Sequence, residues 1–413
     1  MSKDKNKDKL SAICQVNDNL LMGVNHTLGF FYELLTQIEI LEAVSDANEK
    51  KNIATFVSRI TPIKNLLEKE QQELMDISSE IKLGKSGASY KINEIYAGMT
   101  YLSMRSKILA AIINFISKLT PKALKPSLGK LNQYAPKKLI IPGSYRSNCR
   151  LTKSTPLVAI VTPSYNQGAY IKRTIDSVLD QGYPNLEYIV QDGNSTDQTV
   201  EILHGYEKAL CWESKKDHGQ GNAINLGFKK TSGEIMAYLN SDDLLLPGTL
   251  NYVVDYFNLH PEVDVVYGHR IIIDENDCEI GRWILPPHNN EILSWADYIP
   301  QETLFWRRRI WDKVDGTIDE SFQFALDWDL LIRFRNAGAK FHRLPRFLGA
   351  FRVHQNQKTS SKINTAGLKE MMIIRQRCRG KYVTHGEILM QTVTYLGKSI
   401  FYMILSKMGL LQY

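Results

Sequence analysis

The sequence predicts an α/β fold in which helices flank a mostly parallel β-sheet. Three apolar runs have the length of buried parallel strands and end in polar, turn-forming residues, within 157–166, 186–197 and 233–243. Helical patterns separate these runs, at 169–181, 196–208, 221–231 and 247–259. Alternating strands and helices form right-handed βαβ units, and such sheets bind ligands at the carboxyl ends of their strands. We therefore expect one shared site at the ends of the three runs.

The pattern of residues divides the chain into four parts. Residues 1–95 form a helical N-terminal region, because apolar side chains recur there at alternating spacings of four and three. Residues 96–154 form a basic helix and a proline-rich linker, residues 155–360 the α/β domain, and residues 361–413 a C-terminal helical segment. We expect the N-terminal helices to form a small bundle on their own chain, and the alternative is pairing between two copies of the chain.

Composition excludes several classes of protein. With 43% hydrophobic and 23% charged residues among 413, the chain is globular, with two or three domains, rather than disordered. The five cysteines are scattered and form no CxxC pair, which argues against a disulfide framework or a zinc site and favours a reducing cytoplasm. The N-terminus lacks the apolar segment of a secretory signal, and no apolar run reaches the roughly 18 residues of a spanning helix.

Positive charge is concentrated in one part of the chain. The net charge of +7 is too small to predict nucleic-acid binding, and no nucleic-acid motif accompanies it. Residues 96–153, however, carry eleven Lys and Arg and no acidic residue, and the stretch at 388–411 is largely apolar with isolated lysines. Basic amphipathic segments lie on anionic membranes. We expect peripheral contact with the inner face of the cell membrane, and the alternative is that both segments pack against the α/β domain.

The ends of the first two strands carry candidate binding residues. Pro163 ends the first strand, and Tyr165 offers a flat ring on which a planar base can stack. Asp192 ends the second strand, where its carboxylate can accept a hydrogen bond from a uracil-type N–H. We interpret Asp197 as a structural residue in the first turn of the next helix.

The next two segments suit a diphosphate and a metal ion. Asp242 and Asp243 follow the third strand, and adjacent carboxylates repel each other unless a cation or a donor neutralises them. Oxygen ligands of this kind suit Mg²⁺ or Mn²⁺, which one or two carboxylates bind together with substrate phosphates. The alternative is a capped turn before a helix. In residues 217–225, glycines allow close backbone approach, and a helix that begins there would direct its N-terminus at phosphate.

Two segments toward the C-terminus carry further ionisable side chains. Asp327 and Asp329 lie two positions apart on a predicted helix and point in different directions, so one suits a general base and the other a first-turn acid. Trp328 suits either a platform for the acceptor or the core. His354 is a candidate metal ligand, although a lone histidine is more often structural.

Together these segments resemble the family 2 nucleotide-sugar glycosyltransferases, inverting enzymes of the GT-A fold with a Rossmann-like sheet flanked by helices. The resemblance covers about residues 155–360 and rests on the order and spacing of six motifs: TPSYN (162–166), QDGNSTDQT (191–199), DHGQGNAINLG (217–227), LNSDD (239–243), LDWDLLIRF (326–334) and FRVH (351–354). The segment LNQYAPKKLIIP (131–142) resembles the lead-in before such domains.

The resemblance implies a role for each matching residue. The nucleotide sugar would be bound by Pro163, Tyr165, Asp192, Asp217 and Asp242. Asp243 and His354 would bind Mn²⁺ or Mg²⁺, and Asp327 would be the catalytic base. The acceptor would contact Gln301, Trp328 and Asp329.

Two positions depart from the family pattern. Gly193 stands where a second Asp is frequent, which we expect to cost little. Leu326 stands where a Glu is frequent before the base, and this change removes a carboxylate that could contact the acceptor.

The resemblance implies a metal-dependent, inverting hexosyltransferase that uses a UDP-linked sugar. Its acceptor would be a saccharide or a lipid-linked saccharide in the synthesis of bacterial surface polysaccharide or other glycans. One alternative is an inactive scaffold that binds partners through its N-terminal helices. The presence of four aspartates and one histidine at the site argues against it: Asp192, Asp242, Asp243, Asp327 and His354. A nucleotidyltransferase is a second alternative, but the first loop, TPSYNQG, has no Arg or Lys to hold a triphosphate.

Overall fold

The computed structural model describes residues 130–147, 155–355, 357 and 366–407, together with separate positions between 58 and 76. Internal contacts divide the chain into two compact units, Met1–Lys125 with Leu389–Lys398, and Pro126–Ile388 with Ser399–Tyr413. In the first unit, the described positions from 58 to 76 are helical, and Lys64 pairs with Glu68 one turn later at 3.3 Å. The rest of the predicted N-terminal bundle and the basic helix lie outside the described residues.

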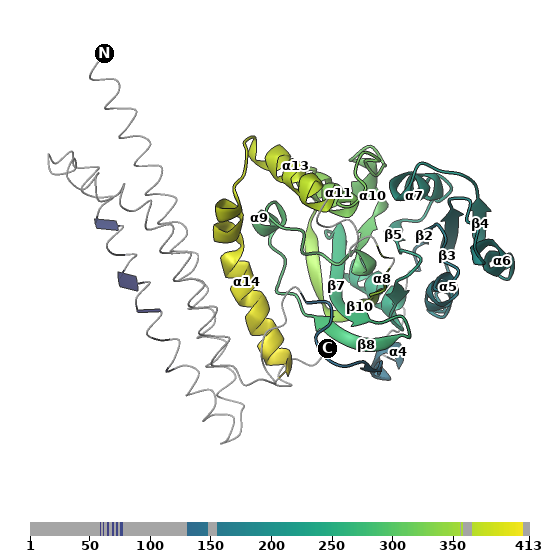
Figure 1. Cartoon of the computed structure of the whole chain (residues 1–413), viewed down its shortest axis with the longest axis horizontal. Helices are drawn as coiled ribbons and strands as arrows, with labels where there is room; N and C mark the ends of the chain where they lie inside the picture. The colour runs from purple at the N-terminus through teal and green to yellow at the C-terminus, as the bar shows by residue number, and fades with distance from the viewer. Residues whose placement is uncertain are drawn as a thin grey trace, which may run out of the picture. The chain divides into compact units, whose positions relative to one another are not determined.

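The second unit is built on one mixed sheet of ten strands (Figure 1). Its main path runs through β1 (Lys137–Lys138), β8 (Cys278–Trp283), β7 (Val265–Ile273), β9 (Phe305–Arg307), β5 (Ile235–Tyr238), β2 (Val158–Ser164), β3 (Leu186–Asp192) and β4 (Cys211–Ser214). Two strands lie off this path: β10 (Phe341–Arg352) is parallel to β7, and β6 (Leu244–Leu245) is antiparallel to β10. The predicted parallel pairing of β5, β2 and β3 is confirmed. Strand β4, which the sequence analysis did not identify, is also parallel to β3, whereas β9 runs antiparallel to both of its neighbours, β5 and β7.

Helices cover both faces of the sheet, as the sequence predicts (Figure 1). On one face, the core packs against α7 (Gln220–Phe228), α10 (Arg308–Asp312) and α11 (Leu326–Asn336). On the other, it packs against α5 (Ile171–Leu179), α6 (Thr199–His204) and α8 (Thr249–Leu259). Neighbouring residues of β2 belong to different cores, Ile160 to the second and Val161 to the first, because side chains alternate across a strand. A strand buried on both faces therefore appears in the sequence as a continuous apolar run.

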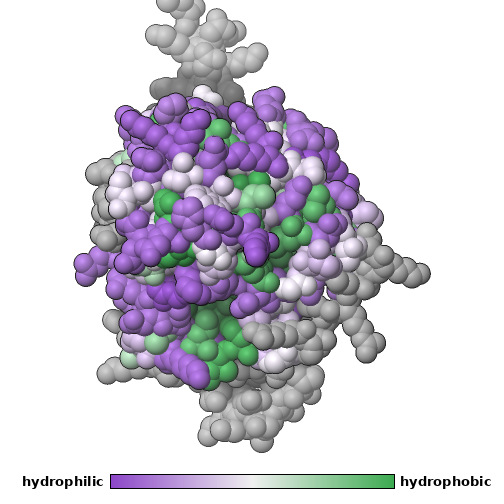
Figure 2. Space-filling model, turned by 90° about the vertical axis from the view of Figure 1, so that its right-hand side faces the viewer, coloured by the Kyte–Doolittle hydropathy of each residue, from purple (hydrophilic) through white to green (hydrophobic). Residues whose placement is uncertain are grey.

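Further helices complete the unit. They are α4 (Ser144–Ser147), α9 (Asn290–Leu293), the 3-10 turn η2 (Gln301–Thr303) and α13 (Leu368–Arg379). Helix α14 (His385–Lys407) follows, and its residues Leu389–Lys398 belong to the first unit. Within the described part of the chain, no helix has both the length and the apolar character needed to cross a bilayer. In the view of Figure 2, hydrophilic side chains cover most of one face, and hydrophobic ones gather toward its lower edge.

The lead-in segment before the domain adds an edge strand to the sheet. Strand β1 pairs antiparallel with β8, and the Gln133 side chain donates to the Arg282 carbonyl at 3.1 Å. Glu279 of β8 is almost fully buried, and its carboxylate pairs with Arg282 at 2.8 Å and accepts a hydrogen bond from the Tyr134 hydroxyl. These contacts lie on β8, at the opposite end of the strand order from β4.

The sheet brings the carboxyl ends of its parallel strands to one edge. Ser164 lies opposite Asp192, and Asp192 lies opposite Ser214, so the last residues of β2, β3 and β4 are in register. Strand β10 joins this edge through β6, where Ala350 pairs with Leu244 just after the two adjacent aspartates. The predicted convergence of the loops is thus set by the pairing of the strands.

Candidate active site

The loops after β2 and β3 are joined by side-chain hydrogen bonds. Asn166 has a left-handed backbone with φ of 52°, which Asn tolerates, and its amide oxygen accepts from the Thr196 N–H at 2.9 Å. The Asn166 N–H donates to the Ser195 hydroxyl at 2.7 Å. The Asp197 carboxylate accepts from the N–H groups of Gly168 at 2.8 Å and Thr199 at 3.0 Å, which agrees with the structural role expected for it.

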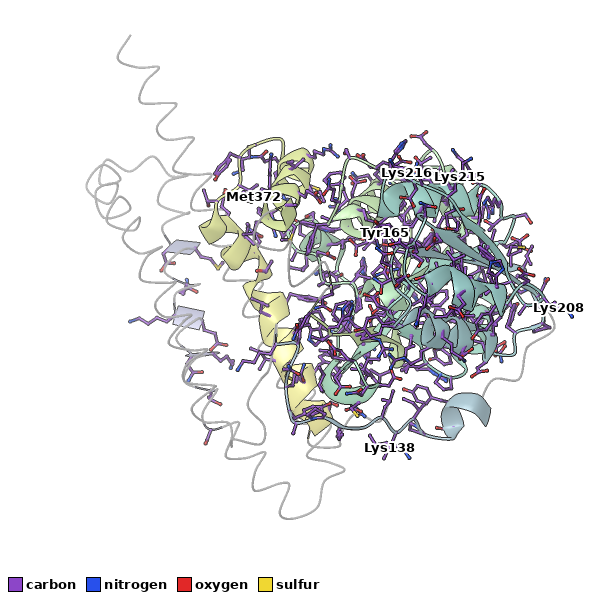
Figure 3. The ribbon with its side chains drawn as sticks, turned by 45° about the vertical axis from the view of Figure 1, so that its right-hand side comes forward. Lys138, Tyr165, Lys208, Lys215, Lys216 and Met372 are labelled. Carbon is purple, nitrogen blue, oxygen red and sulfur yellow. The ribbon has the colours of Figure 1, made fainter. Side chains whose placement is uncertain are left out.

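Asp192 is fully buried at the base of these loops. Its carboxylate accepts from the Ser195 N–H at 2.8 Å, the Ser195 hydroxyl at 2.5 Å and the Ser214 hydroxyl at 2.6 Å. A carboxylate can accept about four hydrogen bonds, so these three leave room for one more. Pro163 is buried beside it, whereas Tyr165 is 62% exposed (Figure 3). A ring in that position is free to receive a flat ligand.

Asp217 lies against Gly193, the position that departs from the family pattern. A Cβ atom added to Gly193 would come within 2.9 Å of the Asp217 Oδ2 atom. The other oxygen of Asp217 accepts from the Gly219 N–H at 2.8 Å, just before α7. The Asp217 carboxylate therefore occupies the space into which a side chain at 193 would point. In this chain, the second carboxylate beside Asp192 comes from the loop between β4 and α7.

The loop that carries the adjacent aspartates is held from two sides. The Thr174 hydroxyl on α5 contacts the carbonyl oxygens of Ser241 at 2.9 Å and Asp243 at 2.8 Å. At the end of β10, the Arg352 N–H donates to the Asp243 carboxylate at 3.0 Å, and the Arg352 side chain donates to the Asp242 carbonyl at 2.8 Å. His354 lies 3.0 Å from the Asp242 carboxylate. Three of the predicted site residues thus come together here.

The two aspartates have different surroundings. The side chain of Asp242 is 19% exposed, whereas Asp243 is only 1% exposed. Burial raises the pKa of Asp243 well above its usual range, and the negative charges of Asp242 and Glu302 raise it further. A buried carboxylate next to another acid is costly until a cation neutralises it.

The residues around Asp243 suit a hard divalent cation that is also bound by the substrate. Among the described residues, no group of three or more His, Cys, Asp or Glu side chains could hold a metal ion by itself. Mg²⁺ and Mn²⁺ need no such group, because one or two carboxylates bind them together with phosphate oxygens and water. Asp243 and Asp242, with His354 in contact, fit that requirement.

An amide network joins Asp243 to Gln301, and a buried ion pair begins at the next residue, Glu302. Asn240 donates to Asp243 at 3.3 Å and to Gln301 at 3.1 Å, and the Gln301 amide donates to the Tyr238 carbonyl at 2.7 Å. Gln301, expected at the acceptor, is only 7% exposed and holds this network. Glu302 forms a bidentate pair with Arg270, with distances of 2.7 and 2.6 Å.

Sequence reasoning did not find Arg270, Glu302 or Asp297. The Arg270 guanidinium lies 4.9 Å from the Trp283 ring centroid and 4.5 Å from that of Phe351. Arg270 follows the run VVYGH and precedes III, and a single cation in a buried strand requires an acidic partner. That signal was present in the sequence, but it does not say which acid pairs with it.

Asp327 is placed in the first turn of α11 with its side chain half-buried. Its carboxylate accepts from the Trp328 N–H at 2.9 Å, and burial raises its pKa to about 6. The charges of Arg270 and Glu302 affect the pKa of both Asp327 and Asp243, so one ion pair lies within electrostatic reach of both acids. Asp297, in the loop after α9, has its pKa raised by desolvation of its carboxyl group and by the charge of Asp327.

The two other residues expected at the acceptor occupy structural positions. Trp328 is fully buried, and its indole N–H donates to the Leu293 carbonyl at 2.8 Å, so in this structure it belongs to the core. Asp329 is 5% exposed and pairs with Arg333 at 2.9 Å and Arg377 at 3.4 Å. Two positions along a helix differ by about 200° in direction, which separates Asp329 from Asp327.

Comparison with known proteins matches the region that contains most of this site. Residues 159–318 match the family model described as glycosyl transferase family 2, a span that ends before Asp327 and His354. An uncharacterised glycosyltransferase of Rickettsia typhi is 30% identical over 220 residues, which cover 51% of this chain and 68% of that protein. Chondroitin synthase of Escherichia coli is 29% identical over 210 residues, which cover 49% of this chain and 30% of that protein.

Solved structures resemble the fold at low sequence identity. A structure of S. aureus TarS, residues 1–349, in complex with UDP-GlcNAc has 17% identity and a TM-score of 0.45, and the match covers 60% of this chain and 72% of that one. A mannosyltransferase from Pyrobaculum calidifontis in complex with GDP-Man and Mn²⁺ has 18% identity and a TM-score of 0.46, over 75% of this chain and 85% of that one. The sheet flanked by helices is the fold expected from the motifs, and the chain is a member of glycosyl transferase family 2.

Proposed function

We propose that the protein transfers a sugar from a nucleoside-diphosphate sugar, with UDP as the expected nucleotide, to an acceptor hydroxyl with inversion. The observation that carries this proposal is the convergence of Asp192 with the adjacent Asp242 and Asp243 at the carboxyl ends of the parallel strands, where Arg352 and His354 contact the two adjacent aspartates. Asp243 suits the diphosphate side of a donor and Asp327 the acceptor side. The donor bound at this edge would present its anomeric carbon to a hydroxyl activated by Asp327.

The reaction is a single in-line displacement. Asp327 accepts the proton of the acceptor hydroxyl while that oxygen attacks the anomeric carbon, and the bond from this carbon to the diphosphate oxygen breaks. The nucleoside diphosphate leaves with the bonding electron pair. A carboxylate with a pKa of about 6 is ionised at neutral pH and is a better proton acceptor than an ordinary aspartate.

Asp243 and His354 would hold the metal ion, and Asp242, which His354 contacts, would lie on the side of the donor's ribose. When bound, a divalent cation neutralises negative charge on the departing diphosphate. Asp192, Asp217, Pro163 and Tyr165 line the loops that would bind the nucleotide, since the first two supply buried and half-buried carboxylates and Tyr165 an exposed ring.

A donor panel tests the proposal. The full chain is incubated with UDP- and GDP-linked sugars and Mn²⁺, and nucleoside diphosphate and pyrophosphate are measured as products. We expect nucleoside diphosphate from at least one donor, loss of turnover with EDTA, and recovery on adding Mn²⁺. Pyrophosphate as the product would indicate a nucleotidyltransferase. Absence of turnover and of a thermal shift with every donor would favour the inactive scaffold. Undiminished transfer in chelator would refute the metal assignment.

The biological setting is part of the same proposal. The two sequence relatives named above come from the bacteria Rickettsia typhi and Escherichia coli, and one is named a chondroitin synthase, which supports a role in glycan or surface polysaccharide synthesis. We further propose that the basic and apolar segments bring the enzyme to the inner face of a membrane that carries a lipid-linked acceptor. Flotation with anionic liposomes at low and high salt tests this, with Lys118, Lys122 and Lys125 replaced as the comparison. Protein that fails to float at low salt would refute it.

A further inference from the structure

The segment that leads into helix α11 is not held by the N-cap residue. That residue is Ala325, whose side chain cannot accept a hydrogen bond, and within the first turn the Trp328 N–H donates to Asp327 itself. Asp327 is the second residue of this helix. Whatever holds the start of α11 therefore also fixes where the Asp327 carboxylate lies.

The N–H groups just before the helix are held from α13, about 45 residues later in the chain. The Glu370 carboxylate accepts from the N–H groups of Gln323 at 2.9 Å, Phe324 at 2.8 Å and Ala325 at 2.9 Å. Glu370 is 9% exposed, so these bonds are largely shielded from water. A negative charge at the start of a helix is also favourable with the helix dipole.

Other residues of α13 hold the surroundings of the same turn. Arg375 donates to the Trp295 carbonyl at 2.8 Å and lies 5.1 Å from the Trp328 ring centroid. Arg377 pairs with Asp329 at 3.4 Å. The residues on either side of Leu326 and Asp327 are therefore all contacted from one helix, which lies outside the matched span 159–318.

We infer that Glu370 is a positioning residue for the catalytic base, and that α13 is part of the catalytic apparatus rather than an appended helix. This inference rests on the proposed function of Asp327. A base must lie within hydrogen-bond reach of the acceptor hydroxyl, and a displacement of about 1 Å can cost about a hundredfold in rate. Glu370 acts through Asp327 and needs no contact with substrate.

A double-mutant cycle in the full chain tests the inference. Glu370→Ala should lower kcat by about 10- to 100-fold and change donor affinity less than about twofold. In an Asp327→Asn background, the same substitution should cause no further loss beyond about twofold, because its effect passes through the base. Glu370→Gln, which keeps one oxygen acceptor, should restore part of the loss.

The matched control is Glu279→Gln on β8, another buried carboxylate with several partners. It should lower thermal stability while leaving kcat of the folded protein within about twofold in both backgrounds. Equal, multiplicative losses from Glu370→Ala with and without Asp327 would overturn the inference, as would a loss of kcat that only follows the fraction of folded protein.

Hydrogen exchange provides a readout that does not require turnover. Glu370→Ala and Glu370→Gln should speed exchange of the amides at 323–325 and leave exchange at β8 unchanged. Unchanged exchange at 323–325 would show that Glu370 does not hold the segment that leads into α11. If the wild-type protein turns over no donor in the panel, the proposed function fails, and the exchange measurement still decides whether Glu370 holds the start of α11.

Discussion

The carboxylates on the two sides of the site have different surroundings. On the side of β2 and β3, Asp192 and Asp197 accept hydrogen bonds from backbone N–H groups and hydroxyls of their own loops. On the side of β5 and α11, burial raises the pKa of Asp243 and Asp327, and neighbouring acids add to the shift at Asp243. The first side is complete once the chain has folded. The second concentrates negative charge that a cation, a proton or a substrate must balance.

Asp327→Asn gives the largest effect expected on the second side. Loss of a general base lowers turnover by about 10² to 10⁴-fold, whereas donor binding needs no proton transfer and should change little. Steady-state kinetics and a donor-binding measurement separate the two quantities. Normal turnover by this variant would show that Asp327 is not the general base and that another acid accepts the proton.

Asp243→Asn should lower activity but raise thermal stability. Transfer should fall by about a hundredfold or more, because the group proposed to hold the metal is lost. The pKa of Asp243 is raised in the folded state, so its ionisation opposes folding increasingly as the pH rises above the unfolded value. In chelator at neutral pH, the melting temperature of the variant should therefore exceed that of the wild type. A lower melting temperature would contradict the account of the charged side.

Asp192→Asn should change stability in the other direction. Its Oδ2 atom accepts from both the Ser195 N–H and the Ser214 hydroxyl, and an amide nitrogen in that place would leave buried donors unpaired. We expect the free energy of unfolding to fall by about 1–3 kcal/mol. Chemical denaturation of the two asparagine variants side by side measures this, and equal shifts at Asp192 and Asp243 would abolish the distinction between the two sides.

The pH dependence of turnover should report the charged side alone. Because the pKa of Asp327 is raised to about 6, the fraction of ionised base falls below that pH, and kcat should drop about tenfold per pH unit there. Donor binding measured over the same pH range separates the titration of Asp327 from that of Asp243, which would hold the metal ion. An acid limb near the ordinary aspartate pKa of about 4 would show that Asp327 is not buried during turnover.

The sequence alone determined the strands and the loops that carry the site. Strands β2, β3 and β5 could be located from continuous apolar runs that end in turn residues, because a strand that is buried on both faces carries apolar side chains at nearly every position. Parallel strands share one edge for their carboxyl ends, so the convergence of Asp192, Asp242 and Asp243 followed from the same pattern. The antiparallel strand β9 was missed, since three residues are too few to show a period.

Only the tertiary structure decided which donors each acid accepts from and which acids have raised pKa values. A sequence motif names Asp192, Asp243 and Asp327 alike, but hydrogen-bond donors and burial depend on chain segments far away. Arg352 lies 109 positions from Asp243, which accepts its N–H, and Glu370 lies 45 positions from Ala325, whose N–H it accepts. Trp328 likewise entered the core because Leu293, 35 positions earlier, accepts its indole N–H. Hydration and charge act through space, so neighbours in the fold, and not in the sequence, set the chemistry of each carboxylate.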